Sequence, residues 1–214
     1  MKDVLEELAA TAREVARRGS GGDELIAVNL RREYAADVED VWEALTDPQR
    51  LARWFAPVTG DLRAGGAFAV EGNAEGEIRE CRPPSALTVT WGSPVSIVRV
   101  RLTATGAGTA LDLEHTVPAA FAGSGAGALY VGPGWDVAVL GLALWLRGEL
   151  VDDPAAWEAS PEVLEVNAGS IAAWAAAVTA SGTATHDEIT AATAAARAQF
   201  TPGQSDADGD PAAG

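Results

Sequence analysis

The feature that most constrains the fold is a change of hydrophobic period between residues 26 and 55. From residue 26 to residue 30, apolar side chains alternate with polar ones, which is typical of a strand with one buried face. From residue 38 to residue 45 they recur at helical spacing, and Asp47-Pro48 then begins a second short helix. The pattern therefore predicts a strand followed directly by two short helices.

Further apolar-alternating segments follow, separated by Gly and Pro turns, and they predict an antiparallel meander. They lie at residues 61–71, 77–82, 87–91, 98–102 and 111–115. A Gly-rich stretch at 122–134 predicts a loop. The run from Trp135 to Leu150 is apolar nearly all round, which indicates a buried helix that needs a curved sheet to cover it.

The two ends of the chain predict further helices. Residues 3–18 carry an apolar helical stripe and lead into a Gly-Ser-Gly-Gly linker. The stripe formed by Ile171, Trp174 and Val178, and the capping box that begins at Thr185, predict two C-terminal helices. We therefore expect an N-terminal amphipathic helix with its linker (1–22), a central domain (23–152), a helical extension (153–203) and a disordered tail (204–214).

Composition excludes several classes of function. The net charge of −16 argues against binding to nucleic acid or to an anionic membrane. A single cysteine, Cys81, and two histidines leave too few residues for a disulfide framework or a zinc site, so we expect no metal and no cofactor. The longest apolar run, residues 137–146, is about half of a membrane span. Since the N-terminus lacks the apolar core of an export signal, we expect a cytoplasmic protein.

Seven short motifs occur in a characteristic order within the central part of the chain. They are Asp37–Pro48, Trp54-Phe55, Gly60–Gly66, Glu80–Pro84, Leu87–Trp91, Glu114-His115 and Gly134-Trp135. Together they resemble the family related to the activator of Hsp90 ATPase, within the START-like/polyketide-cyclase superfamily. The resemblance covers residues 25–150 and implies an α+β helix-grip fold, in which a curved antiparallel sheet wraps around a long C-terminal helix. In this superfamily an apolar cavity lies between the sheet and that helix.

The candidate ligand-binding residues are the large side chains expected on inward surfaces. They are Trp54, Phe55, Phe68, Trp91, His115, Trp135 and Leu142. For any single tryptophan, ordinary core packing is the favoured interpretation, and we assign Trp42 to the core outright because its helical stripe is complete without a ligand. His115 alternates in phase with the apolar residues of its strand, so it points inward. It could serve as a general base or orient a ligand, but a hydrogen-bonded core histidine is the favoured interpretation.

Three classes of function follow from this resemblance and these residues. The favoured one is non-enzymatic binding of a small hydrophobic or aromatic molecule in the cavity. A cyclase-like or aromatase-like enzyme would need acid–base groups such as His115 and Tyr130. A protein-interaction, regulatory or co-chaperone-like module, or a homodimer, would use the apolar stripes of the terminal helices. We assign no catalytic residue.

Overall fold

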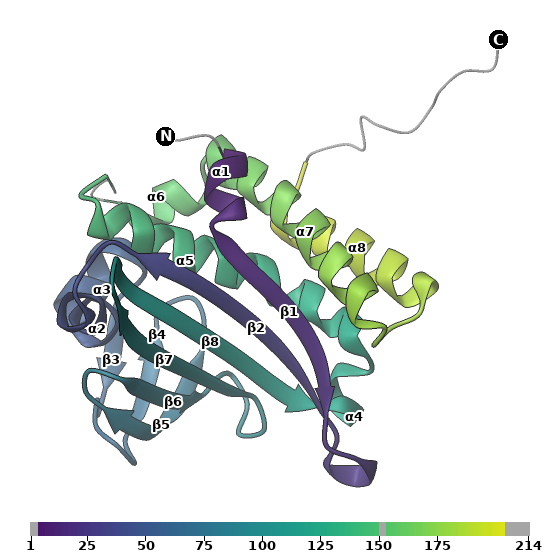
Figure 1. The fold of residues 1–214 in the computed structure, drawn as a ribbon, viewed down its shortest axis with the longest axis horizontal. Coiled ribbons are helices and arrows are strands. Elements are labelled where there is room, and N and C mark those ends of the chain that lie inside the picture. The colour runs from purple at the N-terminus through teal and green to yellow at the C-terminus, as the bar shows by residue number, and fades with distance from the viewer. Residues whose placement is uncertain (1–3, 150–152, 204–214) are drawn as a thin grey trace.

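One antiparallel sheet of eight strands forms one layer of the molecule in the computed structural model, which describes residues 4–149 and 153–203 (Figure 1). Its strand order is β1-β2-β8-β7-β6-β5-β4-β3. The strands are β1 (Thr11–Arg18), β2 (Leu25–Tyr34), β3 (Val58–Gly60), β4 (Ala67–Val70), β5 (Glu75–Arg82), β6 (Ala86–Thr90), β7 (Ile97–Thr105) and β8 (Gly108–Pro118).

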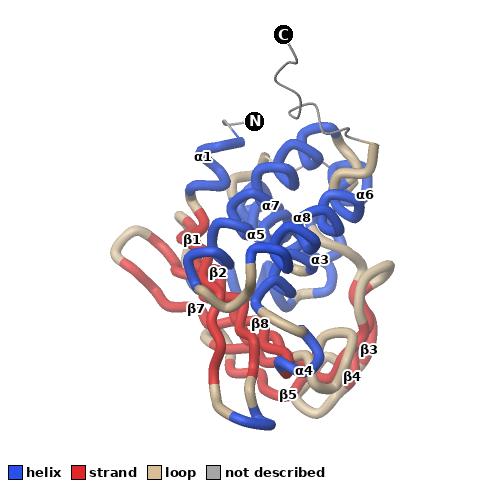
Figure 2. The backbone as a smooth tube through the Cα atoms, turned by 90° about the vertical axis from the view of Figure 1, so that its right-hand side faces the viewer, coloured by secondary structure: helices blue, strands red, loops and turns tan. Residues whose placement is uncertain are grey.

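Helices cover one side of the sheet, and most of them follow the last strand in the chain (Figure 2). They are α1 (Val4–Ala9), α2 (Val38–Thr46), α3 (Pro48–Trp54), α4 (Ala119–Ala122), α5 (Gly132–Leu146), α6 (Pro154–Glu158), α7 (Pro161–Ser181) and α8 (His186–Phe200), with short 3-10 helices η1 (Gly21–Asp23) and η2 (Gly125–Tyr130). The predicted order of elements, one strand followed by two short helices and a meander, is confirmed by β2, α2, α3 and the strands from β3 to β8. Asp47 separates the two short helices, because its carboxylate accepts from the Gln49 backbone N–H at 2.7 Å and so caps α3.

The curved sheet and the buried helix α5 form the grip that the resemblance implies. Val100 on β7 and Leu113 on β8 are cross-strand partners, and both face Leu142 of α5. Leu142 is 1% exposed, as expected for a helix that is apolar nearly all round. The fold is therefore α+β and of the helix-grip type.

The prediction of one helix over residues 3–18 is wrong. Helix α1 ends at Ala9, and β1 then pairs with β2 along its whole length, with Val15 opposite Val28. Val15 fits a helical stripe and a strand face equally well, and the backbone of β2 offers an otherwise unpaired edge. Tertiary pairing thus outweighs local helical pattern. The predicted linker at 19–22 is the hairpin loop between these strands, and Gly19 turns there with φ of +82°.

Three other segments differ from the sequence prediction. The predicted strand 61–71 is shorter, because residues 61–66 form the turn between β3 and β4. The Gly-rich stretch 122–134 is not one open loop: it contains η2, in which Leu129 is fully buried. Helix α5 begins at Gly132 rather than at Trp135, since Pro133 suits the first helical turn, where its missing N–H leaves no bond unmade.

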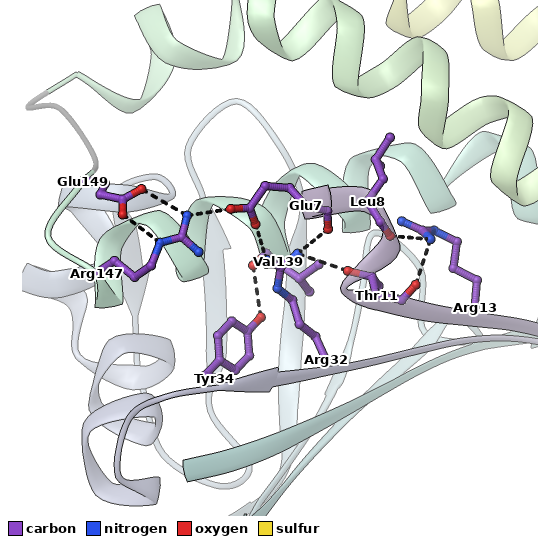
Figure 3. Close-up of polar contacts among 9 residues, drawn as sticks. All are labelled: Glu7, Leu8, Thr11, Arg13, Arg32, Tyr34, Val139, Arg147 and Glu149. Atoms are coloured by element: carbon purple, nitrogen blue, oxygen red, sulfur yellow. Dashed lines mark hydrogen bonds and ion pairs between the residues drawn. The ribbon is translucent and has the colours of Figure 1, made fainter. Parts of the chain in front are cut away.

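Buried ion pairs hold the N-terminal segment on the body of the protein (Figure 3). The Glu7 carboxylate of α1 accepts from Arg32 Nη2 at 2.5 Å and from Arg147 Nη2 at 2.8 Å. Arg32 lies on β2, and Arg147 follows the C-terminal end of α5. Because Glu7 and Arg32 are each only 4% exposed, this network joins a short helix, the sheet and the grip helix inside the protein.

The predicted C-terminal helices are confirmed as α7 and α8. Helix α7 packs against α1, α5, α8 and β1. Trp174 of α7 lies over Gly132, where an added Cβ would come within 2.5 Å of the indole ring, so the glycine permits this close approach. By length and composition α7 is the one described helix that could cross a membrane, but its residues Ile171, Trp174 and Val178 are fully buried in the fold. The predicted tail at 204–214 lies outside the described residues.

Candidate ligand-binding site

An apolar inner cavity lies between the sheet and the helices α2, α3 and α5. It consists of two adjoining hollows of about 120 Å³ and about 140 Å³. Both are lined by Leu45, Leu51, Phe55, Leu87, Val89 and Trp91, and this shared wall is what makes them neighbours. An apolar cavity of about 150 Å³ accepts a benzene ring. Each hollow therefore has room for about one aromatic ring.

The structure brings six of the seven predicted ligand-binding residues to this inner cavity. The first hollow is lined by Trp54, Phe55, Trp91, Trp135 and Leu142, and the second by Phe55, Phe68 and Trp91. Trp42 belongs to the core cluster and does not line either hollow. Most of the aliphatic lining was not among the predicted residues, and it comes from alternate residues of β6, β7 and β8. Its members include Leu87, Val89, Val98, Val100, Leu111 and Leu113.

The aromatic side chains form a continuous row along the cavity. Ring centroids are 6.1 Å apart for Phe68 and Trp91, 5.2 Å for Trp91 and Trp135, and 5.8 Å for Trp135 and His115. Gly76 on β5 makes room for the first ring, because an added Cβ there would lie 2.8 Å from the Phe68 ring and 2.0 Å from the Thr90 carbonyl oxygen. The row thus depends on a glycine as well as on the aromatic residues.

His115, the seventh predicted residue, is buried at the end of this row and uses both ring nitrogens. Its Nδ1 accepts a hydrogen bond from Trp135 Nε1–H at 3.1 Å. Its Nε2 lies 2.7 Å from Ser96 Oγ. An indole N–H only donates, so Nδ1 is unprotonated and the neutral ring carries its proton on Nε2, which donates to Ser96. The hydrogen-bonded core histidine is therefore the interpretation that the geometry supports.

The contact between Ser96 and His115 does not make a nucleophile and its base. A serine is activated when the histidine accepts its proton, and a third group holds the opposite ring N–H. Here Trp135 fixes the opposite tautomer, because its own N–H occupies the nitrogen that would have to be protonated. The pair orients the indole of Trp135 over the cavity instead.

Burial lowers the pKa of His115 to about 4, so the ring is neutral at pH 7. In the unfolded chain the pKa returns to about 6.5, and between these two values the unfolded state binds more protons. We therefore expect the free energy of unfolding to fall by about 2–3 kcal/mol from pH 7 to pH 4.5 on account of this residue. Urea denaturation should show the loss, and a His115→Gln variant, which can keep both hydrogen bonds, should lack it. An NMR titration of the ring with a midpoint near 6.5 would contradict this assignment.

A larger outer hollow of about 690 Å³ opens beside the inner cavity, between α5 and the C-terminal extension. It shares Phe55, Trp91, Trp135 and Ala138 with the first inner hollow, and His115 also lines it. Its far wall comes from α6, α7 and the end of α8. This hollow could not be predicted from the sequence, because it depends on how the terminal helices are placed relative to the domain.

Asp136, which sequence analysis also missed, fixes the position of the cavity wall. This buried carboxylate on α5 follows Trp135 directly and pairs with Arg13 Nε of β1 at 2.8 Å. It also accepts from Trp174 Nε1 at 3.0 Å and from Ser170 Oγ, both on α7. The sequence did offer a signal: Asp136 is the one acid in an otherwise apolar helix, and a buried carboxylate needs a partner. Among the described residues no group of three or more His, Cys, Asp or Glu could hold a metal ion.

The grip helix, the curved sheet and the cavity between them define a protein of the START-like class. The family described as Activator of Hsp90 ATPase homolog 1-like protein matches residues 35–146, more than half of the chain. The protein belongs to this family. No curated protein matches the chain.

Solved structures extend the likeness beyond the domain. CalU16 from Micromonospora echinospora is 40% identical in its crystal structure, which covers 79% of this chain and 98% of that protein with a TM-score of 0.65. Its solution NMR structure is 39% identical, covers 80% of this chain and 97% of CalU16, and has a TM-score of 0.68. DynU16, described as a putative protein in the dynemicin biosynthetic locus, is 26% identical over 59% of this chain and 50% of its own, with a TM-score of 0.53.

Proposed function

We propose that the protein binds a small hydrophobic or aromatic molecule in the inner cavity without acting on it chemically. The observation that carries the proposal is the pair of adjoining apolar hollows of about 120 Å³ and about 140 Å³ beside the aromatic row. Cavities lined by aliphatic and aromatic side chains favour ligands of the same character, because such ligands leave water on binding. Each hollow accommodates one ring.

The polar groups nearest the cavity favour binding over catalysis. His115 is the one histidine there, and Trp135 and Ser96 occupy its two nitrogens. A general base needs a ring nitrogen that is free to accept a proton from the substrate, or it must give up one of its present hydrogen bonds to do so. The arrangement instead stabilises a fixed indole wall, which suits a binding protein.

The family relationship does not by itself bring a partner to this chain. Folds of this kind host unrelated functions, so the name of the family is no argument for Hsp90 as the partner. The locus in which DynU16 occurs is a biosynthetic one, which favours a small molecule over a chaperone as the ligand of related proteins.

Filling the first hollow tests the proposal. Ala138 on α5 lines this hollow, and an Ala138→Phe substitution would place a ring where the ligand is expected. We expect toluene, a probe of one ring, to bind the full chain in isothermal titration calorimetry and to lose at least about tenfold in affinity in this variant. The matched control is Ala172→Phe at an exposed position of α7. Equal affinity of the wild-type protein and the Ala138→Phe variant would contradict the proposal.

A further inference from the structure

We propose that the outer hollow is a second subsite, which receives a polar part of the same ligand, either neutral or carrying an amine. The inference rests on the proposed function, because it assigns one part of the ligand to the inner cavity and adds a second part in the outer hollow. One part is a ring of the size of the inner hollows, and the other is a larger group with hydroxyl or N–H donors.

Continuity between the two spaces supports one ligand rather than two. Phe55, Trp91, Trp135 and Ala138 line both the first inner hollow and the outer hollow. A molecule whose ring lies among these aromatic side chains therefore has its substituents directed at the outer hollow. The difference in volume, about 120 Å³ against about 690 Å³, assigns the smaller part of the ligand to the inner space.

Asn167 of α7 supplies a hydrogen-bonding group on the wall of the outer hollow. The residue is 7% exposed, and its Nδ2 donates to the Phe200 carbonyl oxygen at 3.1 Å. Its Oδ1 is buried and has no hydrogen-bond partner among the described residues. A buried acceptor without a donor is destabilising, so a hydroxyl or N–H group reaching this wall would supply what the protein lacks.

The charge of the lining residues decides which polar groups fit. Among the described residues that line the outer hollow, Glu158 is the one that carries a formal charge, and none is Lys or Arg. The other polar side chains there, including Asn73 and Gln199, are neutral. An anionic group would enter next to a carboxylate without a cation to pair with, which costs free energy. Neutral and amine-bearing groups meet no such penalty.

Four probes with one phenyl ring test the inference on the full chain at pH 7.5: toluene, 4-phenylbutan-1-ol, 4-phenylbutylamine and 4-phenylbutanoate. Calorimetry should show that the alcohol and the amine bind with at least about tenfold higher affinity than the carboxylate.

In an Asn167→Leu variant the affinity for the alcohol should fall by about five- to tenfold, while toluene binds as before. Because Asn167 also holds Phe200, a second variant is needed, and Ala159→Trp fills the hollow from an exposed position. The Ala159→Trp variant should bind the alcohol and the amine more weakly but toluene equally well. Its control is Ala155→Trp, because Ala155 is exposed and lies outside the hollow.

The outcomes separate the two proposals. If toluene does not bind, the proposed function itself fails. If toluene binds but the alcohol, the amine and the carboxylate have equal affinities, or the carboxylate binds most tightly, the inner site stands and the second subsite is overturned. Unchanged affinity of the alcohol in both Asn167→Leu and Ala159→Trp would overturn it as well.

Discussion

Replacing Asp136 with alanine is expected to lower the free energy of unfolding by about 3–5 kcal/mol. The carboxylate pairs with Arg13, and the two side chains are 1% and 9% exposed. Its removal would leave a buried guanidinium without a counter-charge, and would also take the acceptor from Trp174 Nε1 and Ser170 Oγ. Truncating one partner of a buried pair is costly for this reason, whereas the pair as a whole adds little.

Urea denaturation measures this loss against a matched surface pair. Asp112 pairs with Arg31 at 2.8 Å, but the two side chains are 42% and 52% exposed. An Asp112→Ala variant should therefore lose at most about 1 kcal/mol. Equal losses in the two variants would mean that Asp136 does not hold α5 to β1 and α7 as described. Because Asp136 adjoins Trp135, the Asp136→Ala variant should also bind toluene more weakly.

Removing the carboxylate of Glu7 is expected to have an effect of similar size, about 3–5 kcal/mol, in a Glu7→Ala variant. Arg32 is buried, and its Nε has no hydrogen-bond partner among the described residues. Without the carboxylate, its Nη1 would keep only two uncharged acceptors, the backbone carbonyl oxygen of residue 7 and Thr11 Oγ1, so the buried charge would stay uncompensated. A double variant, Glu7→Leu with Arg32→Met, replaces both charges by apolar groups and should recover much of the loss. If the double variant were less stable than Glu7→Ala, the unpaired charge would not be the cause.

The same carboxylate should make stability depend on pH in acid. Burial is the largest single influence and raises the pKa of Glu7, but the hydrogen bonds and charges of Arg32 and Arg147 outweigh it, so the net pKa lies below 4.5. The unfolded chain therefore takes up this proton first as the pH falls. The contribution of Glu7 is complete above about pH 4.5 and is lost below it. Most of this window lies below that of His115, whose effect develops between pH 6.5 and about pH 4.

Much of the fold could be predicted from the sequence because its signals are local. Alternation of apolar and polar residues specifies the strands, and an apolar run too hydrophobic to face water specifies the buried helix α5. The order of the motifs indicates how these elements assemble. The N-terminal strand could not be predicted in this way. Val15 satisfies both periods, and only the free edge of β2, a tertiary feature, decides between them.

The candidate site was predictable to the extent that it is aromatic. Large side chains on inward faces gave Trp91, Trp135 and His115, and the structure places their rings in contact. The outer hollow was not predictable, since the helices that wall it are separated by many residues from the sheet. Asn167 has no distinctive sequence context, and its significance comes from an acceptor that folding leaves unpaired.

Intermolecular NOEs between toluene and the full chain would show whether the space between the sheet and α5 receives an aromatic ring. We expect NOEs from the toluene protons to the methyl groups of Leu142 and Leu113 and to the indole protons of Trp135, all of which line the first hollow. NOEs confined to residues outside the two inner hollows, or none at saturating toluene, would contradict this expectation.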